Sequence, residues 1–227
     1  MKKIIKNVLV FLLYFVYIKV YLFLMEKAGM PLTNFSLSTR VIILFTLNIV
    51  FIAFLFILYK DELKTDFKDF KKNWKKYLKK YVNYYMIGLI LMAISNIVLQ
   101  HLLSIKISGN EEAVEDLIKI VPFYMLFQSV IYAPFVEEMI FRKVIRNVIS
   151  NGKLFVIISG VVFGVVHISD FSDYKQILMG IPYIIMGLDF AYIYYKSKNI
   201  YTTMTLHFAH NAILYSIQII GGLLWKR

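Results

Sequence analysis

The chain has 227 residues, a net charge of +12 and no cysteine. Without cysteine it can have no disulfide, no thiolate nucleophile and no cysteine metal ligand, so its chemistry must use carboxylate, imidazole, hydroxyl or amide groups. Hydrophobic residues make up 59% of the sequence, far more than in an average soluble domain. The composition therefore indicates a polytopic membrane protein.

Apolar segments of nearly bilayer-spanning length recur along the chain. A transmembrane helix needs about twenty mostly apolar residues, and seven windows approach this length: 4–25, 41–59, 82–104, 118–140, 154–169, 177–195 and 200–222. The longest strongly polar interval, Lys60–Lys80, is too short to enclose a core of its own. The sequence predicts one membrane domain over residues 1–227, an all-α polytopic bundle of about seven transmembrane helices, with a range of six to eight.

Positive charge alternates along the connections between these windows. It is concentrated in the N-terminus, the Lys60–Lys80 interval, the connection after Arg142 and the pair Lys196 and Lys198. The positive-inside rule then places the N-terminus and a Lys60–Lys80 loop in the cytoplasm, in a multi-pass protein of the cell membrane. Seven spans would put the basic C-terminus outside, which fits this rule poorly.

The Lys60–Lys80 interval is predicted to be a hairpin that lies on the inner leaflet as a partly amphipathic helix. Aromatic residues alternate with its lysines, and the lysines flank apolar runs rather than forming a basic face on a folded domain. Anionic lipid headgroups are therefore the predicted partner, and nucleic acid is not.

Ionisable residues also occur within, or at the edges of, the apolar windows. A charge near the middle of a bilayer costs at least a few kcal/mol, so such residues are functional candidates by default. They are Glu137, Glu138, Asp189, His167, His207 and His210.

Each polar motif also has a purely structural interpretation. In "EEMIFR", Glu138 and Arg142 can form an ordinary i, i+4 ion pair at a helix end. In "FGVVH", His167 can be a histidine at the water interface. In "HFAHN", the polar groups can satisfy neighbouring helices. Taken alone, each motif is weak.

The depth of these residues in the membrane strengthens their combination. At 1.5 Å rise per residue, Glu137, His207 and Asn211 lie roughly 10–16 Å from the same membrane face, and His167 lies roughly 20 Å from it. His207 and Asn211 are four residues apart and share a helix face, as do Glu138 and Arg142. Glu137 lies about 100° round the helix from Glu138, so it is expected to point elsewhere and be free for chemistry.

The three motifs together resemble the CPBP intramembrane proteases, also called the Abi or CAAX-protease family. The family has paired glutamates followed after three residues by arginine, a phenylalanine four positions before a histidine, and a later histidine followed after three residues by asparagine. Here these are Glu137-Glu138 with Arg142, Phe163 with His167, and His207 with Asn211. The motifs fall in residues 118–222, and residues 1–117 match only as generic membrane helices.

The resemblance implies hydrolysis of a peptide bond within the membrane. It implies that Glu137 and His167 activate the attacking water and that His207 and Asn211 stabilise the oxyanion, with Glu138, Arg142 and Phe163 in support. Zinc is an alternative, because Glu137, His167 and His207 would leave one open position for water. The sequence contains no His-Glu-x-x-His helix, so the preferred interpretation needs no cofactor.

The expected substrate is a membrane-associated peptide or protein. Lysine greatly exceeds arginine, which suggests an AT-rich bacterial source, and a bacterial family member need not act on a prenyl group. The alternative is a non-catalytic membrane immunity or regulatory partner protein whose glutamates and histidines only hold helices together. A weaker third hypothesis is a proton-coupled transporter that uses Glu137, Glu138 and Asp189 as a relay.

Overall fold

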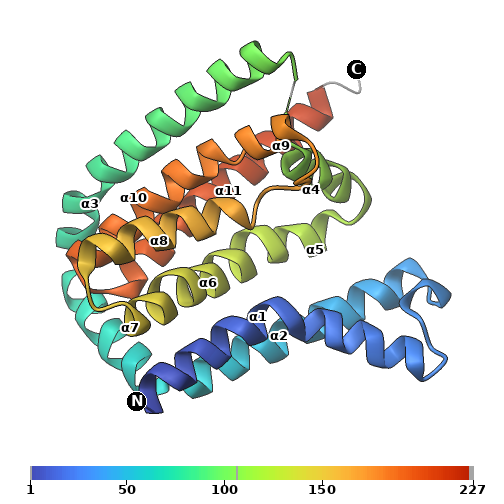
Figure 1. Ribbon diagram of the computed structural model, residues 1–227, viewed down its shortest axis with the longest axis horizontal. Helices are drawn as coiled ribbons and strands as arrows, with labels where there is room; N and C mark the ends of the chain where they lie inside the picture. Colours follow the sequence, from blue (N-terminus) through green and yellow to red (C-terminus); the bar gives the residue numbers. More distant parts are fainter. Residues whose placement is uncertain (1, 106, 225–227) are drawn as a thin grey trace.

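A computed structural model describes residues 2–105 and 107–224, and it confirms the predicted all-α membrane helix bundle. The larger helices are α1 (Lys2–Lys27), α2 (Leu37–Leu58), α3 (Lys60–Leu103), α4 (Gly109–Ile120), α8 (Gly152–Val165), α10 (Ile181–Ser197) and α11 (Ile200–Leu224). Short helices complete the chain: η1 (Leu32–Asn34), α5 (Pro122–Leu126), η2 (Phe127–Tyr132), α6 (Ala133–Glu137), η3 (Glu138–Val144), α7 (Ile145–Val148) and α9 (Tyr174–Leu178). Figure 1 shows their arrangement.

Within the described residues, four helical segments are long and apolar enough to cross a membrane: α1, α2, α3 and Tyr174–Ser197. The number of spans, predicted as about seven, stays a prediction. The expected fifth window, 154–169, differs from the structure at its end. Helix α8 stops at Val165, so His167 lies in the turn that follows it.

The predicted Lys60–Lys80 hairpin or loop is wrong. These residues form the first half of α3, which continues without interruption for 44 residues into the apolar 82–104 segment. The interval contains no glycine or proline, and a change from polar to apolar side chains does not by itself end a helix. The chain reverses instead at Tyr59, between α2 and α3.

The segment that carries the two glutamates is an irregular helical rod. Helix α5, the π-helix η2, α6, the π-helix η3 and α7 follow one another from Pro122 to Val148 (Figure 1). Pro134 explains part of the irregularity, because it lacks the N–H that an α-helix would donate to the fourth residue before it. Just before it, the Ala133 N–H bonds to the Gln128 carbonyl, a five-residue step. Single π turns inside helices often occur at functional sites.

Helices α8 and α10 pack with their backbones unusually close, and they lie side by side in Figure 1. Three glycines allow this approach. A Cβ added at Gly187 would lie 2.7 Å from the Gly160 carbonyl oxygen, and one added at Gly164 would lie 2.8 Å from the Ile184 backbone nitrogen. Small residues four apart permit such contacts between membrane helices. This packing fixes α8, which carries Phe163 and leads to His167.

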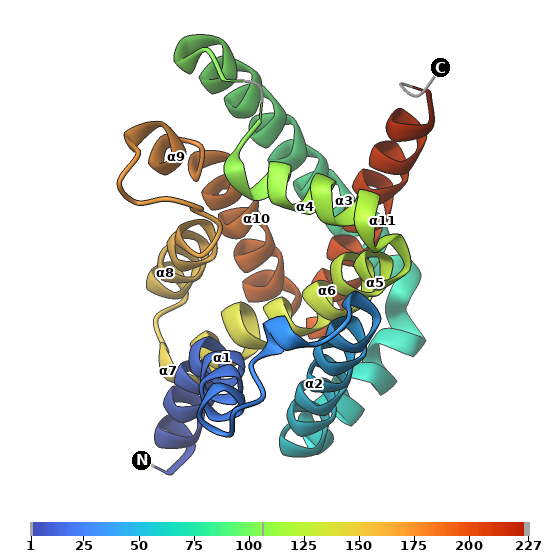
Figure 2. The ribbon, with the colours of Figure 1, turned by 90° about the vertical axis from the view of Figure 1, so that its right-hand side faces the viewer.

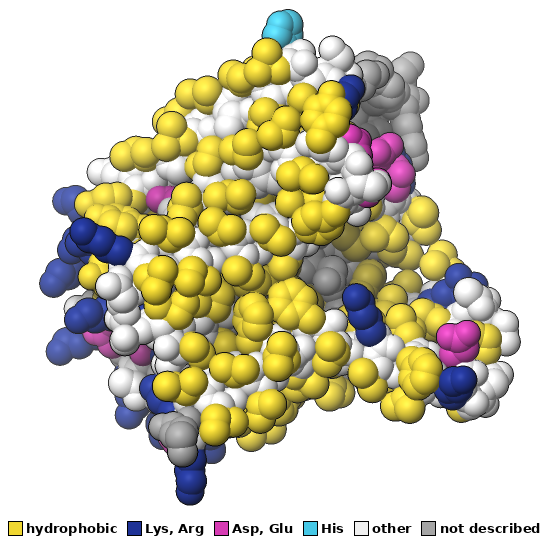
Figure 3. Space-filling view, viewed as in Figure 1, with side chains coloured by type: hydrophobic (Ala, Val, Ile, Leu, Met, Phe, Trp, Pro, Cys, Tyr) yellow, Lys and Arg dark blue, Asp and Glu magenta, His cyan; other side chains and the backbone are white. Residues whose placement is uncertain are grey.

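Helix α1 packs against η3 and α7, and α2 packs against α6. Figure 2 shows both near the irregular rod of α5 to α7, with α8 and α10 on its other side. In Figure 3, Lys and Arg side chains gather at the edge where Figure 1 places the N-terminus, α7 and the first half of α3, beside a broad hydrophobic face. That distribution suits a membrane protein. The cytoplasmic orientation of the basic end stays a prediction.

Candidate active site

The glutamate-rich motif begins with a fully buried ion pair. The Glu138 Oε2 and Arg142 Nε atoms lie 3.3 Å apart, both side chains are 0% exposed, and the contact lacks hydrogen-bond geometry. The Arg142 guanidinium donates to the Ser159 hydroxyl at 3.2 Å, and that hydroxyl donates to the Phe141 carbonyl at 2.7 Å. A charge can remain so deeply buried only when it is paired. The predicted Glu138–Arg142 pair is therefore confirmed.

His207 lies between the two glutamates. Its Nδ1 is 3.0 Å from Glu138 Oε1, and its Nε2 is 3.7 Å from Glu137 Oε2. A carboxylate can only accept a hydrogen bond, so the contact with Glu138 places a hydrogen on Nδ1 and fixes the orientation of the ring. Phe190 of α10 also stacks on the imidazole, with ring centroids 4.9 Å apart.

The expectation that Glu137 points away from Glu138 is wrong, because both carboxylates reach the same imidazole. The two residues stand at the junction of α6 with the π-helix η3. The 100° spacing of an ideal α-helix does not hold across such a junction. Exposure still distinguishes the pair, because the Glu137 side chain is 16% exposed and that of Glu138 is fully buried. Glu137 is thus the glutamate that a substrate or water can reach.

His167 approaches the site from the turn after α8. Its Nδ1 is 2.7 Å from the Phe163 carbonyl oxygen, so Nδ1 carries the donated hydrogen and the neutral ring has Nε2 as its acceptor. The ring stacks on Tyr183, with centroids 4.6 Å apart. Phe163 contacts both His167 and His207, at centroid distances of 4.6 and 6.1 Å. The two histidines are therefore arranged around one phenylalanine.

Asn211 lies one turn beyond His207 on α11, and its amide nitrogen donates to the Ser129 carbonyl oxygen at 2.8 Å. Ser129 belongs to the π-helix η2, so this bond ties α11 to the irregular rod of α5 to α7. An amide nitrogen carries two hydrogens, and this bond uses one of them. Asn211 is thereby positioned while its amide still has a hydrogen for a second acceptor.

Two further polar residues lie beside this site. The Nδ1 atom of His210 is 3.1 Å from the Tyr85 hydroxyl of α3, which supports a structural role for His210. Asp189 packs against α3 where a Cβ added at Gly88 would be 2.6 Å from the Asp189 Cγ atom. The described contacts show no ion pair between Asp189 and Arg142.

Sequence reasoning did not identify Ser159, Tyr183, Phe190 and Ser129, which hold the site residues in place. Ser159 had one signal, because it is a polar residue within the apolar run "FVIISGVVFG". The other three come from segments whose approach to the motifs depends on the fold. No local pattern shows which serine carbonyl or aromatic ring will face a histidine.

Among the residues that the structure describes, no three His, Asp or Glu side chains converge with the spacing of a metal site. Both ring nitrogens of His207 face carboxylates, and Nδ1 of His167 faces a backbone carbonyl. The mechanism proposed for this site therefore assigns no step to a metal, and zinc held by Glu137, His167 and His207 stays an alternative.

Comparison with known proteins agrees with this geometry. Residues 119–213 match the family model described as "Type II CAAX prenyl endopeptidase Rce1-like". The resemblance to the CPBP family is confirmed. The chain is also 33% identical over 115 residues to the protein named "Putative membrane peptidase YdiL" of Bacillus subtilis (strain 168). That alignment covers 49% of this chain and 44% of the relative, so the match spans less than half of the relative's length. No solved structure matches the chain.

The CPBP match coincides with the described site. It includes the α5–α7 rod, α8, α10 and the part of α11 that carries His207 and Asn211. Helices α1, α2 and α3 lie entirely outside it.

Proposed function

We propose that this protein is an intramembrane endopeptidase of the CPBP type that hydrolyses membrane-associated peptides or proteins with an activated water. The observation that carries the proposal is the His207 imidazole held between Glu137 and Glu138, with Asn211 one turn away on the same helix. The family match over these residues supports it.

In the proposed reaction, Glu137 accepts a proton from the attacking water. It is the more accessible of the two glutamates, and positioned general bases typically contribute 10²–10⁴-fold in rate. The acceptor Nε2 of His167 can share the water's second hydrogen. The proton held by Glu137 then passes to the leaving nitrogen as the peptide C–N bond breaks, which gives a carboxylic acid and an amine. The second proton of the water leaves with the acid and moves to the amine, so the products are a carboxylate and an ammonium group and the enzyme returns to its starting state.

The tetrahedral intermediate carries a negative oxygen, for which we propose the second amide hydrogen of Asn211 and an Nε2–H of His207 as donors, because the Nδ1–H of His207 is already bound to Glu138. Removal of one such donor typically costs 10²–10³-fold in rate. Glu138 contributes indirectly, because it holds the His207 ring in its orientation. Arg142 and Ser159 in turn hold Glu138 in place within the buried cluster.

The Glu137–His207 contact also favours a second version of the mechanism, in which His207 shares the water with Glu137. The His167→Ala variant distinguishes the two versions through kcat. If His167 shares the water, its loss should lower kcat by about 10²-fold or more. If His207 does so, His167→Ala should lower kcat only slightly and His207→Ala should cause the large loss.

The decisive experiment compares Glu137→Gln with Asp116→Asn. Both exchange a carboxylate for an amide, but Asp116 is exposed and pairs only with Lys119 in the described structure. Peptides released from membranes containing each variant are measured by mass spectrometry against wild type. We expect at least a 10²-fold loss of release for Glu137→Gln and none for Asp116→Asn.

Full activity of a folded Glu137→Gln protein would refute the peptidase proposal. It would favour the non-catalytic immunity or regulatory partner, for which packing matters and a titratable carboxylate does not. Activity of the purified protein in the presence of a chelator, with metal analysis of the same sample, tests the proposal that no metal takes part. Strict metal dependence would overturn that part of the mechanism and leave the peptidase assignment intact.

A further inference from the structure

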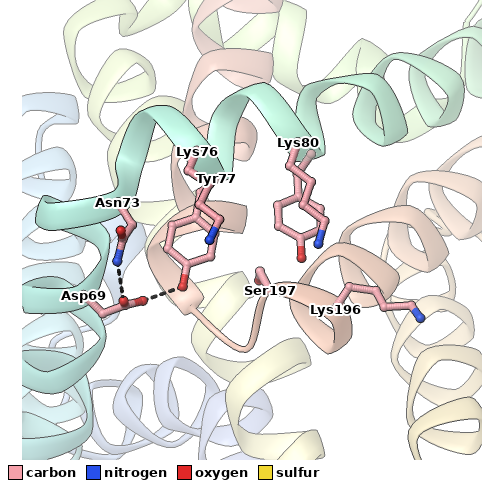
Figure 4. A pocket seen from close by; sticks show the side chains of 8 residues that line it. Asp69, Asn73, Lys76, Tyr77, Lys80, Lys196 and Ser197 are labelled. Carbon is pink, nitrogen blue, oxygen red and sulfur yellow. Dashed lines mark hydrogen bonds between the residues drawn. The ribbon is translucent and has the colours of Figure 1, made fainter.

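A second polar site lies outside the catalytic cluster, between α3 and the end of α10. It is a cavity of about 310 Å³ lined by Asp69, Asn73, Lys76, Tyr77, Lys80, Tyr81, Lys196 and Ser197. Figure 4 shows Asp69 at one end of this pocket and Lys80 and Lys196 toward the other. None of these residues belongs to the catalytic motifs.

The one carboxylate in the pocket, that of Asp69, is hydrogen-bonded to neutral groups. Asp69 accepts hydrogen bonds from the Tyr77 hydroxyl and the Asn73 amide (Figure 4), and from the Asn199 amide at 2.9 Å. In the described structure, no ion pair joins Lys76, Lys80 or Lys196 to an acidic side chain. The pocket is therefore lined by three lysines and one carboxylate. Because that carboxylate is hydrogen-bonded to neutral groups and pairs with none of the lysines, the pocket has an excess of positive charge.

The pocket also stands at the border between the polar and apolar halves of α3. The last lysine of the polar half, Lys80, is followed directly by Tyr81 and the apolar 82–104 segment. On the apolar side, the rings of Tyr84 and Tyr192 lie 5.5 Å apart, and Lys196 lies 5.5 Å from the Tyr192 ring centroid. Tyrosines and lysines in this arrangement are typical of a membrane–water interface.

We propose that this pocket binds the phosphate headgroup of an anionic phospholipid. Lys76, Lys80 and Lys196 contact the phosphate, Tyr77 and Ser197 offer hydroxyls to it, and the acyl chains extend over Tyr84 and Tyr192. Basic pockets between membrane helices bind such headgroups. A free inorganic phosphate carries the same kind of negative charge, but it has no acyl chain to contact the apolar surface that continues from the pocket.

The first test measures the affinity of the full-length protein, in neutral detergent micelles, for phosphatidylglycerol. Phosphatidylcholine and inorganic phosphate are the comparison ligands. We expect saturable binding of phosphatidylglycerol and at least tenfold weaker binding of the other two. Equal binding of inorganic phosphate would overturn the lipid assignment, and equal binding of phosphatidylcholine would overturn any role for the anionic charge.

The second test uses two triple variants with the same loss of charge. The pocket variant is Lys76→Gln, Lys80→Gln and Lys196→Gln; the matched control is Lys68→Gln, Lys71→Gln and Lys72→Gln, whose lysines are exposed on α3 outside the pocket. We expect the pocket variant to lose roughly 10²-fold in phosphatidylglycerol affinity and the control to lose only a few-fold.

An equal loss in both triple variants would mean that the lipid is attracted by the general basic surface, and it would refute a defined pocket. The measurement does not depend on proteolysis, so it remains informative whether or not the peptidase proposal holds.

Discussion

The buried cluster around Glu138 and Arg142 differs from the lysine pocket in how its charges are stabilised. Arg142 is fully buried, and its charge is matched by Glu138 and by the Ser159 hydroxyl. The lysines of the pocket are exposed on α3 and α10, where water can solvate a charge without a partner. Burial makes pairing obligatory and so fixes the geometry of the clustered side chains, while solvation leaves positive charge available to a ligand.

The largest expected effect comes from breaking the buried pair. We expect Arg142→Gln to lower the free energy of unfolding by about 3–5 kcal/mol, because Glu138 would be left as an uncompensated buried charge. The exposed counterpart, Lys119→Gln, breaks the Lys119–Asp116 pair, whose side chains are more than 60% exposed. It should change stability by no more than about 1 kcal/mol. Denaturant titration in mixed micelles measures both.

A double variant sharpens this prediction. Adding Glu138→Gln to Arg142→Gln removes the orphaned charge, so part of the lost stability should return. If the double variant is as unstable as the sum of the two single variants, the cost comes from packing rather than from charge.

A second way to disturb the buried cluster is to push α8 away from α10. We expect Gly187→Ala to destabilise the protein by about 1–3 kcal/mol, since the added Cβ would lie 2.7 Å from the Gly160 carbonyl oxygen. Gly221→Ala is the control, because a Cβ there meets nothing within 4 Å. The midpoint of thermal unfolding should fall for the first variant and stay level or rise slightly for the second. A tolerated Gly187→Ala would show that the helices can separate without loss.

The candidate site residues could be proposed from the sequence alone, for a physical reason. Ionisable groups in an apolar segment are costly, so each one marks a specific need. Glu138 and Arg142 were also predictable as a pair, because i, i+4 spacing brings side chains together on a regular helix. The structure confirms the Glu138–Arg142 pair, and the family-model match includes both residues.

Other features could not be predicted because they depend on irregular backbone or on distant elements. The π-helical turn after Glu137 directs both glutamates to His207, although ideal α-helical geometry separates them. Composition could not predict that α3 continues through Lys60–Lys80, because a lysine-rich stretch is favourable both in a surface loop and in a helix. The approach of Phe190 to His207 requires the packing of α10 against α11.

Lys143 follows Arg142 in the chain and contacts α3, so it tests where obligatory pairing ends. It is nearly buried, and its Nζ lies 3.1 Å from both Glu62 and Asp66 of α3. We expect Lys143→Met to cost about 1–2 kcal/mol, because its acidic partners are only partly buried and water can replace the lysine. The control Lys72→Met, at an exposed position, should stay within about 0.5 kcal/mol. A loss as large as that of Arg142→Gln would show that the buried cluster extends to α3.

The smallest expected effect concerns Asp69, which lines the solvated lysine pocket. This residue precedes the apolar part of α3, and the hydrogen bond from Tyr77 lowers the pKa of its carboxyl, helped by the amides of Asn199 and Asn73. A folded-state pKa below the unfolded value stabilises the protein above the unfolded pKa, near 3.8, and this stability is lost as pH falls through the folded pKa.

Tyr77→Phe should therefore reduce stability at pH 7 by less than about 1 kcal/mol, and the difference from wild type should shrink as the pH is lowered below 3.8. Unfolding midpoints measured in lipid-free micelles at pH 7, 5 and 3 test this, with Tyr84→Phe as the matched control, because Tyr84 makes no hydrogen bond to a carboxylate in the described structure. A constant difference at all three pH values would mean that the Tyr77 hydroxyl contributes through packing and not through the charge of Asp69. In that case even the solvated end of α3 would be organised by contacts of the kind found in the buried cluster, and the contrast between the two regions would hold only for the lysines.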